Sequence, residues 1–247
     1  MNPYLSTKLK YISFVLMVMV VFLHSHNLSG KGDLLNYYVQ NFISNGITKI
    51  SVALFFMISG YLFFFQVEAF PIPSWLQKVQ SRTRSILLPY LLWSLWGMLL
   101  FFTLQSLPYS RSFFNSDVLA EQSIPQLLYI WLVKPLPYQL WFLRHLFVFV
   151  LATPFIYLVT RYAPLVLLIL VALLLLKILD IPDNDFIDNR SFSYFCIGCY
   201  LGIHGRQQVL KTFSTWAIPA LVVWWMLVAL RIGWIVKTGL IIKFGGI

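Results

Sequence analysis

The first strongly apolar run of the sequence is MVMVVFLHSHN, residues 17–27, which ends in two histidines and an asparagine. An ionisable side chain inside hydrocarbon is costly and is usually functional. If a helix begins near Tyr11, His24 lies about 20 Å along its axis, beyond the membrane midplane. A neutral imidazole there can take a proton from a hydroxyl, as acyl transfer to an alcohol requires. The alternative is a histidine at a helix end that bonds to a backbone carbonyl or to water.

The composition around this run indicates a membrane protein. Of the 247 residues, 60% are hydrophobic and only 11% are charged, and the mean hydropathy is +0.79. Soluble domains are roughly 45–50% apolar and about 25% charged. A soluble enzyme and a disordered chain are therefore excluded, and the sequence predicts an all-α, polytopic membrane helical bundle. The net charge of +10 is scattered between apolar runs, which favours helix orientation over nucleic-acid binding.

Two further features are interpreted as structural. Cys196 and Cys199 lie in an apolar helix without other metal ligands, so we expect them to serve packing. Residues 180–188 hold half of the acidic residues but lack the spacing of a calcium loop, which predicts a solvated loop. The sequence thus predicts no metal site.

The apolar runs predict seven complete helices and a partial eighth. The expected ranges are 11–28, 47–66, 86–104, 139–159, 164–179, 191–203, 215–232 and, incomplete, 235–247. We expect the first to be retained, because no small-x-small cleavage site follows it. A segment with Pro71, Pro73 and Trp75 is predicted to lie at the membrane interface. The patch 124–133 is too short to span and is expected to lie on the surface or to re-enter.

The basic residues predict the orientation. Cytoplasmic loops carry an excess of lysine and arginine. With a cytoplasmic N-terminus, the inner face receives Lys8, Lys10, Lys78, Arg82, Arg84, Arg161, Arg206 and Lys211, and the outer face receives Lys31, Arg111, Lys134 and Arg190, which are spread over longer loops. His24, Trp141 and Arg144 are then expected toward the outside.

Five short stretches, in order along the chain, resemble one family. They are VVFLH at 20–24, ALFFMISGYL at 53–62, SRTRSILLPY at 81–90, LWFL at 140–143 and FCIG at 195–198. Together they are similar to the membrane acyltransferases of family 3, which include O-acetyltransferases of bacterial lipopolysaccharide, capsule and other surface glycans. The resemblance extends from the first to the sixth predicted helix, so residues 1–247 are interpreted as a single acyltransferase-like domain.

The sequence departs from the family in two respects. Members often carry an arginine eleven positions before the histidine, where this chain has Ser13, and the nearest basic residue is Lys10. Members usually have about ten spanning helices, so the domain is expected to be incomplete at its C-terminus.

The resemblance implies acetyl-CoA or another acyl-CoA as a cytoplasmic donor, no permanently bound cofactor, and a glycan hydroxyl as acceptor at the bacterial inner membrane. His24 would be the general base, with Asn27 or Ser25 holding its other ring nitrogen. Phosphates of coenzyme A would meet Lys78, Arg82 and Arg84; the alternative for these cations is orientation alone.

Other residues would contact the substrates. Ser59 and Tyr61 would line the channel, unless they only permit close helix packing. Trp141, with Arg144 at the same outer entry, would stack on a sugar, unless the tryptophan belongs to an interfacial belt.

Two other function classes fit the same composition. A transporter or flippase for a glycan or small solute would also place ionisable residues in the membrane, but we find no internal repeat. An inactive, truncated family member is the third interpretation.

Overall fold

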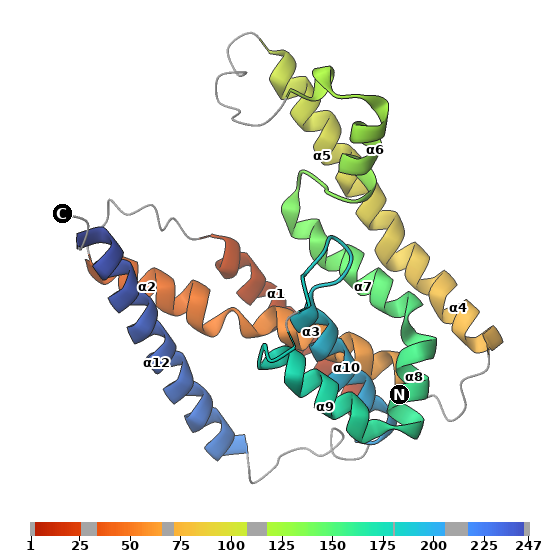
Figure 1. Cartoon of the computed structure of the whole chain (residues 1–247), viewed down its shortest axis with the longest axis vertical. Helices are drawn as coiled ribbons and strands as arrows, with labels where there is room; N and C mark the ends of the chain where they lie inside the picture. Colours follow the sequence, from red (N-terminus) through yellow and green to blue (C-terminus); the bar gives the residue numbers. More distant parts are fainter. Residues whose placement is uncertain are drawn as a thin grey trace. The chain divides into compact units, whose positions relative to one another are not determined.

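In the computed structural model, the residues described are 3–25, 34–65, 72–107, 118–179, 181–205 and 217–244. Their regular structure is entirely helical, which confirms the all-α class. The chain divides into two compact units, one formed by residues 1–59 with 204–247 and the other by residues 60–203 (Figure 1).

The first unit holds α1 (Pro3–His24), α2 (Leu34–Asn41), the π-helix η1 (Phe42–Ile47) and α12 (Ala217–Phe244), with the beginning of α3 (Ile50–Phe64). The η1 segment packs against both α1 and α12. The Ser44 hydroxyl donates to the Phe22 carbonyl at 3.3 Å, and a Cβ on Gly46 would lie 2.9 Å from Val228. The glycine therefore allows α12 to approach η1 closely.

A continuous 35-residue helix, Ile72–Ser106, begins the main part of the second unit. It consists of α4 (Ile72–Arg82), a π-helical turn η2 (Thr83–Leu87) and α5 (Leu88–Ser106). Pro89 has no N–H, and in α geometry its ring would clash with the Ser85 carbonyl. The helix widens there, and the Leu88 N–H bonds to the Thr83 oxygen. The prediction that a separate helix begins at residue 86 is therefore wrong, because the helix already begins at Ile72.

The patch 124–133 forms the short helix α6 (Ile124–Leu132), which is bound along α5. Tyr90 Oη donates to the Leu132 carbonyl at 2.9 Å and Ser94 Oγ to the Trp131 carbonyl at 2.6 Å. The Trp131 indole in turn donates to the Leu91 carbonyl at 3.0 Å. The 3-10 turn η4 (Leu119–Glu121) precedes α6, and the 3-10 turn η5 (Tyr138–Leu140) follows it.

The predicted helix 139–159 is two helices, α7 (Trp141–Leu151) and α8 (Thr153–Tyr162), bent by 59°. Pro154 lacks the N–H that a straight helix would need, and its ring excludes the Val150 carbonyl. The Thr153 hydroxyl donates to that carbonyl at 2.6 Å and accepts from the Trp75 indole at 3.1 Å. The break is thus bonded to α4.

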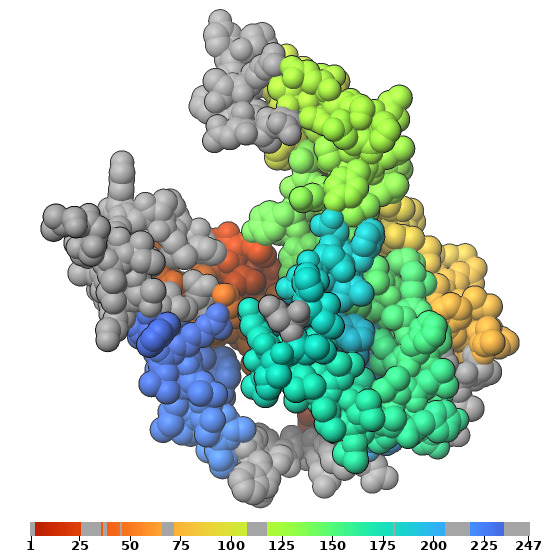
Figure 2. Space-filling view, viewed as in Figure 1, coloured from red at the N-terminus to blue at the C-terminus, as the bar shows by residue number. Residues whose placement is uncertain are grey.

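The helices α9 (Pro164–Leu175) and α10 (Asn189–Ile203) complete the second unit. A stripe of Leu167, Val171 and Leu174 is buried, whereas Leu165, Val166 and Ile169 are exposed. Figure 2 shows α9 and α10 packed beside α7 and α8. The exposed apolar side chains of α9 therefore lie outside this stripe.

Fewer helices reach membrane-spanning length than predicted. Among the described residues, Pro3–His24 and Ile72–Ser106 do so by length and composition, and Tyr138–Tyr162 is a third if the bent pair is one span. Shorter apolar helices are Ile50–Phe64, Pro164–Leu175 and Ile218–Trp234. The predicted helices at 215–232 and 235–247 are one helix, α12, so their separation is a further correction.

Candidate active site

His24 is the last residue of α1 and is exposed. The helix begins at Pro3, before the predicted start at Tyr11, so about 32 Å of axis separates Pro3 from His24. That is about the full thickness of a hydrocarbon core. His24 therefore lies farther along its helix than a start at Tyr11 predicted.

Of the two neighbours proposed for His24, Ser25 is among the described residues and Asn27 is not. Ser25 Oγ donates to the Phe22 carbonyl at 3.2 Å, so its hydroxyl is used by its own helix. Asn27 lies outside the described residues. Ser13 is half-buried on α1, three turns before His24 and on nearly the same face. A neutral hydroxyl thus occupies the position of the family's arginine.

The three predicted donor-binding cations differ in their surroundings. The Lys78 ammonium donates to the Phe63 carbonyl and lies 5.0 Å from the centre of the Phe63 ring. It therefore caps the C-terminal end of α3, where a positive charge is favourable. Arg82 is half-buried at the end of α4, and Arg84 is exposed in η2. Lys78 is thus bonded to the end of α3, whereas Arg82 directly precedes the π-helical turn and Arg84 lies within it.

The predicted channel segment on α3 packs against α10. A Cβ on Gly60 would lie 2.3 Å from the Phe195 carbonyl oxygen, and one on Gly202 would lie 2.8 Å from the Tyr61 oxygen. Tyr61 is buried and its ring contacts Phe65 at 5.3 Å. Two of the five family-like stretches, ISGY and FCIG, thus meet backbone to backbone. This contact favours the packing interpretation of Tyr61, and Ser59 beside it is half-buried.

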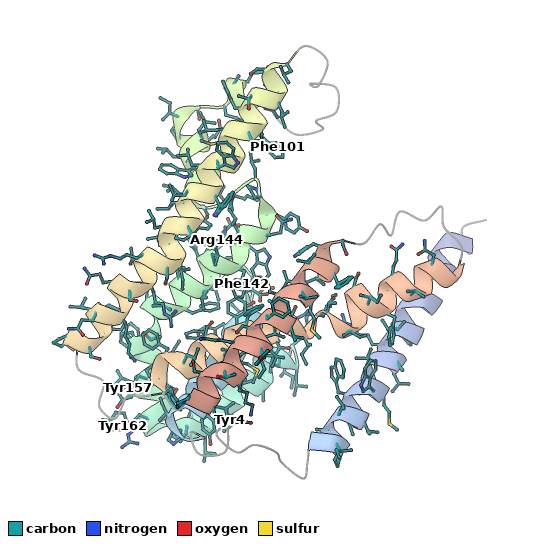
Figure 3. The ribbon with its side chains drawn as sticks, turned by 180° about the vertical axis from the view of Figure 1, so that it is seen from behind. Tyr4, Phe101, Phe142, Arg144, Tyr157 and Tyr162 are labelled. Atoms are coloured by element: carbon teal, nitrogen blue, oxygen red, sulfur yellow. The ribbon has the colours of Figure 1, made fainter. Side chains whose placement is uncertain are left out.

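A polar cluster lies at the beginning of α7, where Trp141 and Arg144 were predicted to receive the acceptor. Figure 3 labels Arg144 on this helix. Trp141 and Arg144 are half-buried, and the next residue, His145, is 5% exposed. The His145 ring meets the Trp141 ring edge to face at 5.3 Å and stacks on Phe149 at 6.1 Å. The charge of Arg144 acts on Tyr90 and Tyr129, so this end of α7 faces α5 and α6.

The acidic loop, residues 181–188, is tied to this cluster. Tyr129 Oη donates to Asp185 Oδ2, and the Ser191 N–H donates to Asp188 Oδ2 at 2.7 Å. Asn184 Oδ1 accepts from the backbone N–H groups of Phe186 and Ile187 at 2.9 and 2.8 Å. The carboxylates are engaged in ordered contacts, so the prediction of a merely solvated loop is incomplete.

The same contact changes the acidity of Tyr129. Its hydrogen bond to Asp185 is the main cause of a pKa raised above the ordinary tyrosine value, and desolvation and the carboxylate charge act in the same direction. The phenol is therefore protonated, and able to donate to Asp185, throughout the neutral range.

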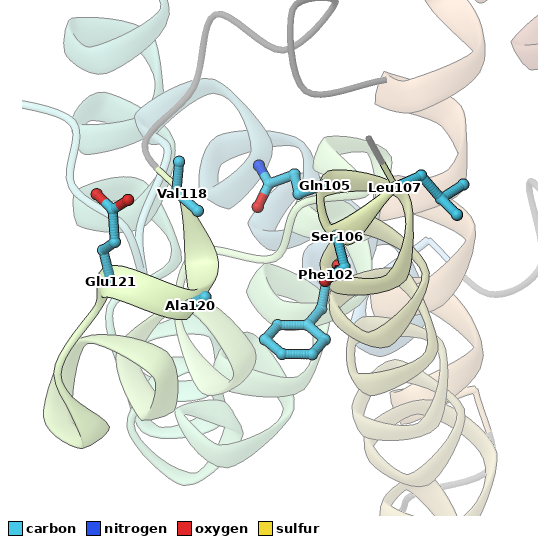
Figure 4. A pocket seen from close by; sticks show the side chains of 7 residues that line it. All are labelled: Phe102, Gln105, Ser106, Leu107, Val118, Ala120 and Glu121. Carbon is cyan, nitrogen blue, oxygen red and sulfur yellow. The ribbon is translucent and has the colours of Figure 1, made fainter. Parts of the chain in front are cut away.

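A cavity of about 390 Å³ lies at the other end of α5 (Figure 4). Its lining is Phe102, Gln105, Ser106, Leu107, Val118, Ala120 and Glu121. Gln105 Oε1 accepts from the Leu119 N–H at 2.9 Å, which holds η4 against α5. The described lining includes the Glu121 carboxylate and none of the predicted site residues.

The second unit contains both the predicted donor-binding arginines, Arg82 and Arg84, and the predicted acceptor-binding residues, Trp141 and Arg144. η2 packs against α7, and Tyr90, on which Arg144 acts, lies only about 9 Å of helix axis beyond Arg84. His24 belongs to the first unit. Across the described residues, no group of three or more metal-binding side chains occurs. Sequence reasoning missed His145, Tyr129 and Asp185; the available signal was a histidine directly after Arg144 in an apolar helix.

Long apolar helices with ionisable side chains at their ends and between them define an integral membrane protein of the all-α class. The chain belongs to an acyltransferase family, because residues 8–245 match the family model described as the acyltransferase domain. This membership confirms the family indicated by the five stretches.

One curated relative of the chain matches it over only part of the relative's own length. The succinoglycan biosynthesis protein ExoH of Rhizobium meliloti (strain 1021) is 26% identical over 226 residues. The alignment covers 89% of this chain and 59% of that protein, so the chain spans less than two thirds of the relative's length. No solved structure matches the chain.

Proposed function

We propose that this protein transfers an acyl group, acetyl in the simplest case, from cytoplasmic acyl-CoA to a hydroxyl of a surface or exported glycan. The observation that carries the proposal is the family match over residues 8–245. The name of the relative, a succinoglycan biosynthesis protein, supports a glycan as the acceptor. The protein would lie in the bacterial inner membrane with its N-terminus in the cytoplasm, as the distribution of basic residues favours.

The residues divide into three roles. Arg82 and Arg84 hold the donor phosphates by charge-assisted hydrogen bonds. Trp141 and Arg144 receive the acceptor. His24 takes the proton of the attacking hydroxyl, whose oxygen forms a bond to the thioester carbonyl carbon as the coenzyme A thiolate leaves.

The decisive experiment measures transfer from radiolabelled acetyl-CoA to a deacylated polysaccharide in proteoliposomes. His24→Ala is expected to reduce the rate by about 10²–10⁴-fold, since a general base usually supplies that factor. It should leave membrane insertion unchanged, because an exposed imidazole adds little packing. His26→Ala, two positions further on, is the matched control and should cost much less. Wild-type transfer by His24→Ala, or greater damage from His26→Ala, would assign the base elsewhere.

A transporter is the second candidate, because the 59° break between α7 and α8 is a feature of helices that form midplane substrate sites. The two functions separate in one assay. An acyltransferase hydrolyses or transfers acetyl-CoA in detergent, whereas a transporter moves solute across a sealed vesicle without consuming it.

A further inference from the structure

Three buried polar atoms beneath the acidic loop make at most weak contacts with the backbones of Asn184 and Trp141. Both ring nitrogens of His145 and Nε of Arg144 are buried, and none forms a hydrogen bond of normal geometry with a described residue. Burying a polar group without a partner is unfavourable, so such groups mark places where a partner binds. Packing alone does not require a histidine here, because a phenylalanine would fill the same stripe between Trp141 and Phe149.

The acidic loop covers these atoms from the side of α10. The Asp188 carboxylate and the Asn184 carbonyl both act on the His145 ring. Asp188 is fixed because it caps α10, and the Asn189 N–H donates to Asp183 Oδ1 at 2.9 Å. On the outer side, Tyr129 holds Asp185 through an exposed hydrogen bond. The loop is thus an ordered cover with one exposed attachment to α6.

The charges around these atoms indicate which kind of ligand group could bind to them. The Arg144 guanidinium only donates hydrogen bonds, a neutral imidazole donates one and accepts one, and the carboxylates of Asp185 and Asp188 only accept. An anionic group would be attracted by the arginine but repelled by both carboxylates. A neutral hydroxyl can accept from the first and donate to the others. The Trp141 ring adds an apolar surface for the C–H face of a sugar.

We propose that Arg144, His145 and Trp141, covered by residues 181–188, form a binding subsite for an uncharged saccharide unit. His145 bonds to one of its hydroxyls, and the loop admits the sugar when the Tyr129–Asp185 contact opens. This proposal rests on the proposed function in one respect: the bound saccharide is taken to be part of the glycan acceptor.

The test is His145→Phe, which keeps the ring but removes both nitrogens. The thermal unfolding midpoint should stay the same or rise, because two unsatisfied polar atoms leave a buried position. The KM for a neutral polysaccharide acceptor should rise at least tenfold, while the KM for acetyl-CoA stays within twofold. Phe149→Leu is the packing control: it should lower the unfolding midpoint without changing the acceptor KM. An unchanged acceptor KM in His145→Phe, or an equal rise in both variants, overturns the subsite.

Two further measurements keep the proposal testable. Tyr129→Phe lies at an exposed position and should raise the acceptor KM at least threefold, because a loosened loop no longer preorganises the site. If the wild-type protein transfers no acyl group, the proposed function fails, and the subsite is judged by equilibrium binding of tritiated cellotetraose to the purified protein. Tighter binding than tetragalacturonate, weakened tenfold by His145→Phe, supports it. A preference for the anion, or no effect of the substitution, refutes it.

Discussion

At the scale of single residues, two histidines of this chain lie in different environments. His24 follows the most apolar run of α1 and is exposed at the end of that helix. His145 is buried, because α10 and the loop before it cover α7. The sequence pattern singled out His24 but not His145, because the burial of His145 depends on segments about forty residues away and could not be predicted from local periodicity.

Tyr129 allows a direct test of the loop contact. Because the folded-state pKa is raised above that of an unfolded tyrosine, the phenol contributes stability that is complete below about pH 10 and is lost as the pH rises through the folded-state pKa. The difference in tyrosinate absorbance between wild type and Tyr129→Phe isolates this residue, and its midpoint should lie above 10. Asp185→Asn should move the midpoint back toward 10. A wild-type midpoint at or below 10 would mean that the Tyr129–Asp185 bond is absent in solution.

At the scale of helices, the existence of the elements could be predicted but their breaks could not. Each apolar run forms a helix, since an unpaired backbone group in lipid is unfavourable. The helix α12 likewise continues through Gly233 without a break. At Pro89 the helix continues through a π-helical turn, whereas at Pro154 the helix breaks with a bend of 59°. The difference depends on tertiary contacts, here the bond from Trp75 to Thr153.

The π-helical turn leads to a prediction about donor binding. Arg82 directly precedes this turn and Arg84 lies within it, whereas Lys78 is bonded to the end of α3. Replacing both arginines with Gln should weaken acyl-CoA binding by about 2 kcal/mol or more, roughly 30-fold, because charged hydrogen bonds contribute about 1.5–3 kcal/mol each. Equilibrium binding of acetyl-CoA measures this. Arg161→Gln, which removes an exposed cation from α8, is the matched control and should bind normally. Equal affinity of the double variant and the wild type would leave the arginines only a topological role.

At the scale of the whole molecule, the family and the helical class could be predicted, because five short stretches and the composition suffice for both. The site could be predicted only in part. Trp141 and Arg144 do lie together on α7, beside α5. The acidic loop was predicted to be only a solvated connection. The sequence does not show that Asp185 bonds to Tyr129, which lies 56 positions earlier.

The helix Ile72–Ser106 provides a test of how the chain crosses the membrane. Its 35 residues extend for about 52 Å, well beyond a hydrocarbon core of about 30 Å, so its two ends should emerge on opposite sides. Gln80 lies near its beginning, and Ala120 lies on η4, which is held against its end; both are exposed. A membrane-impermeant maleimide should label Ala120→Cys in intact spheroplasts and Gln80→Cys only after permeabilisation. The native Cys196 and Cys199 are buried and should give a low background. Labelling of Gln80→Cys in intact spheroplasts, with Ala120→Cys protected, would reverse the orientation. Labelling of both from one side would mean that this helix does not span.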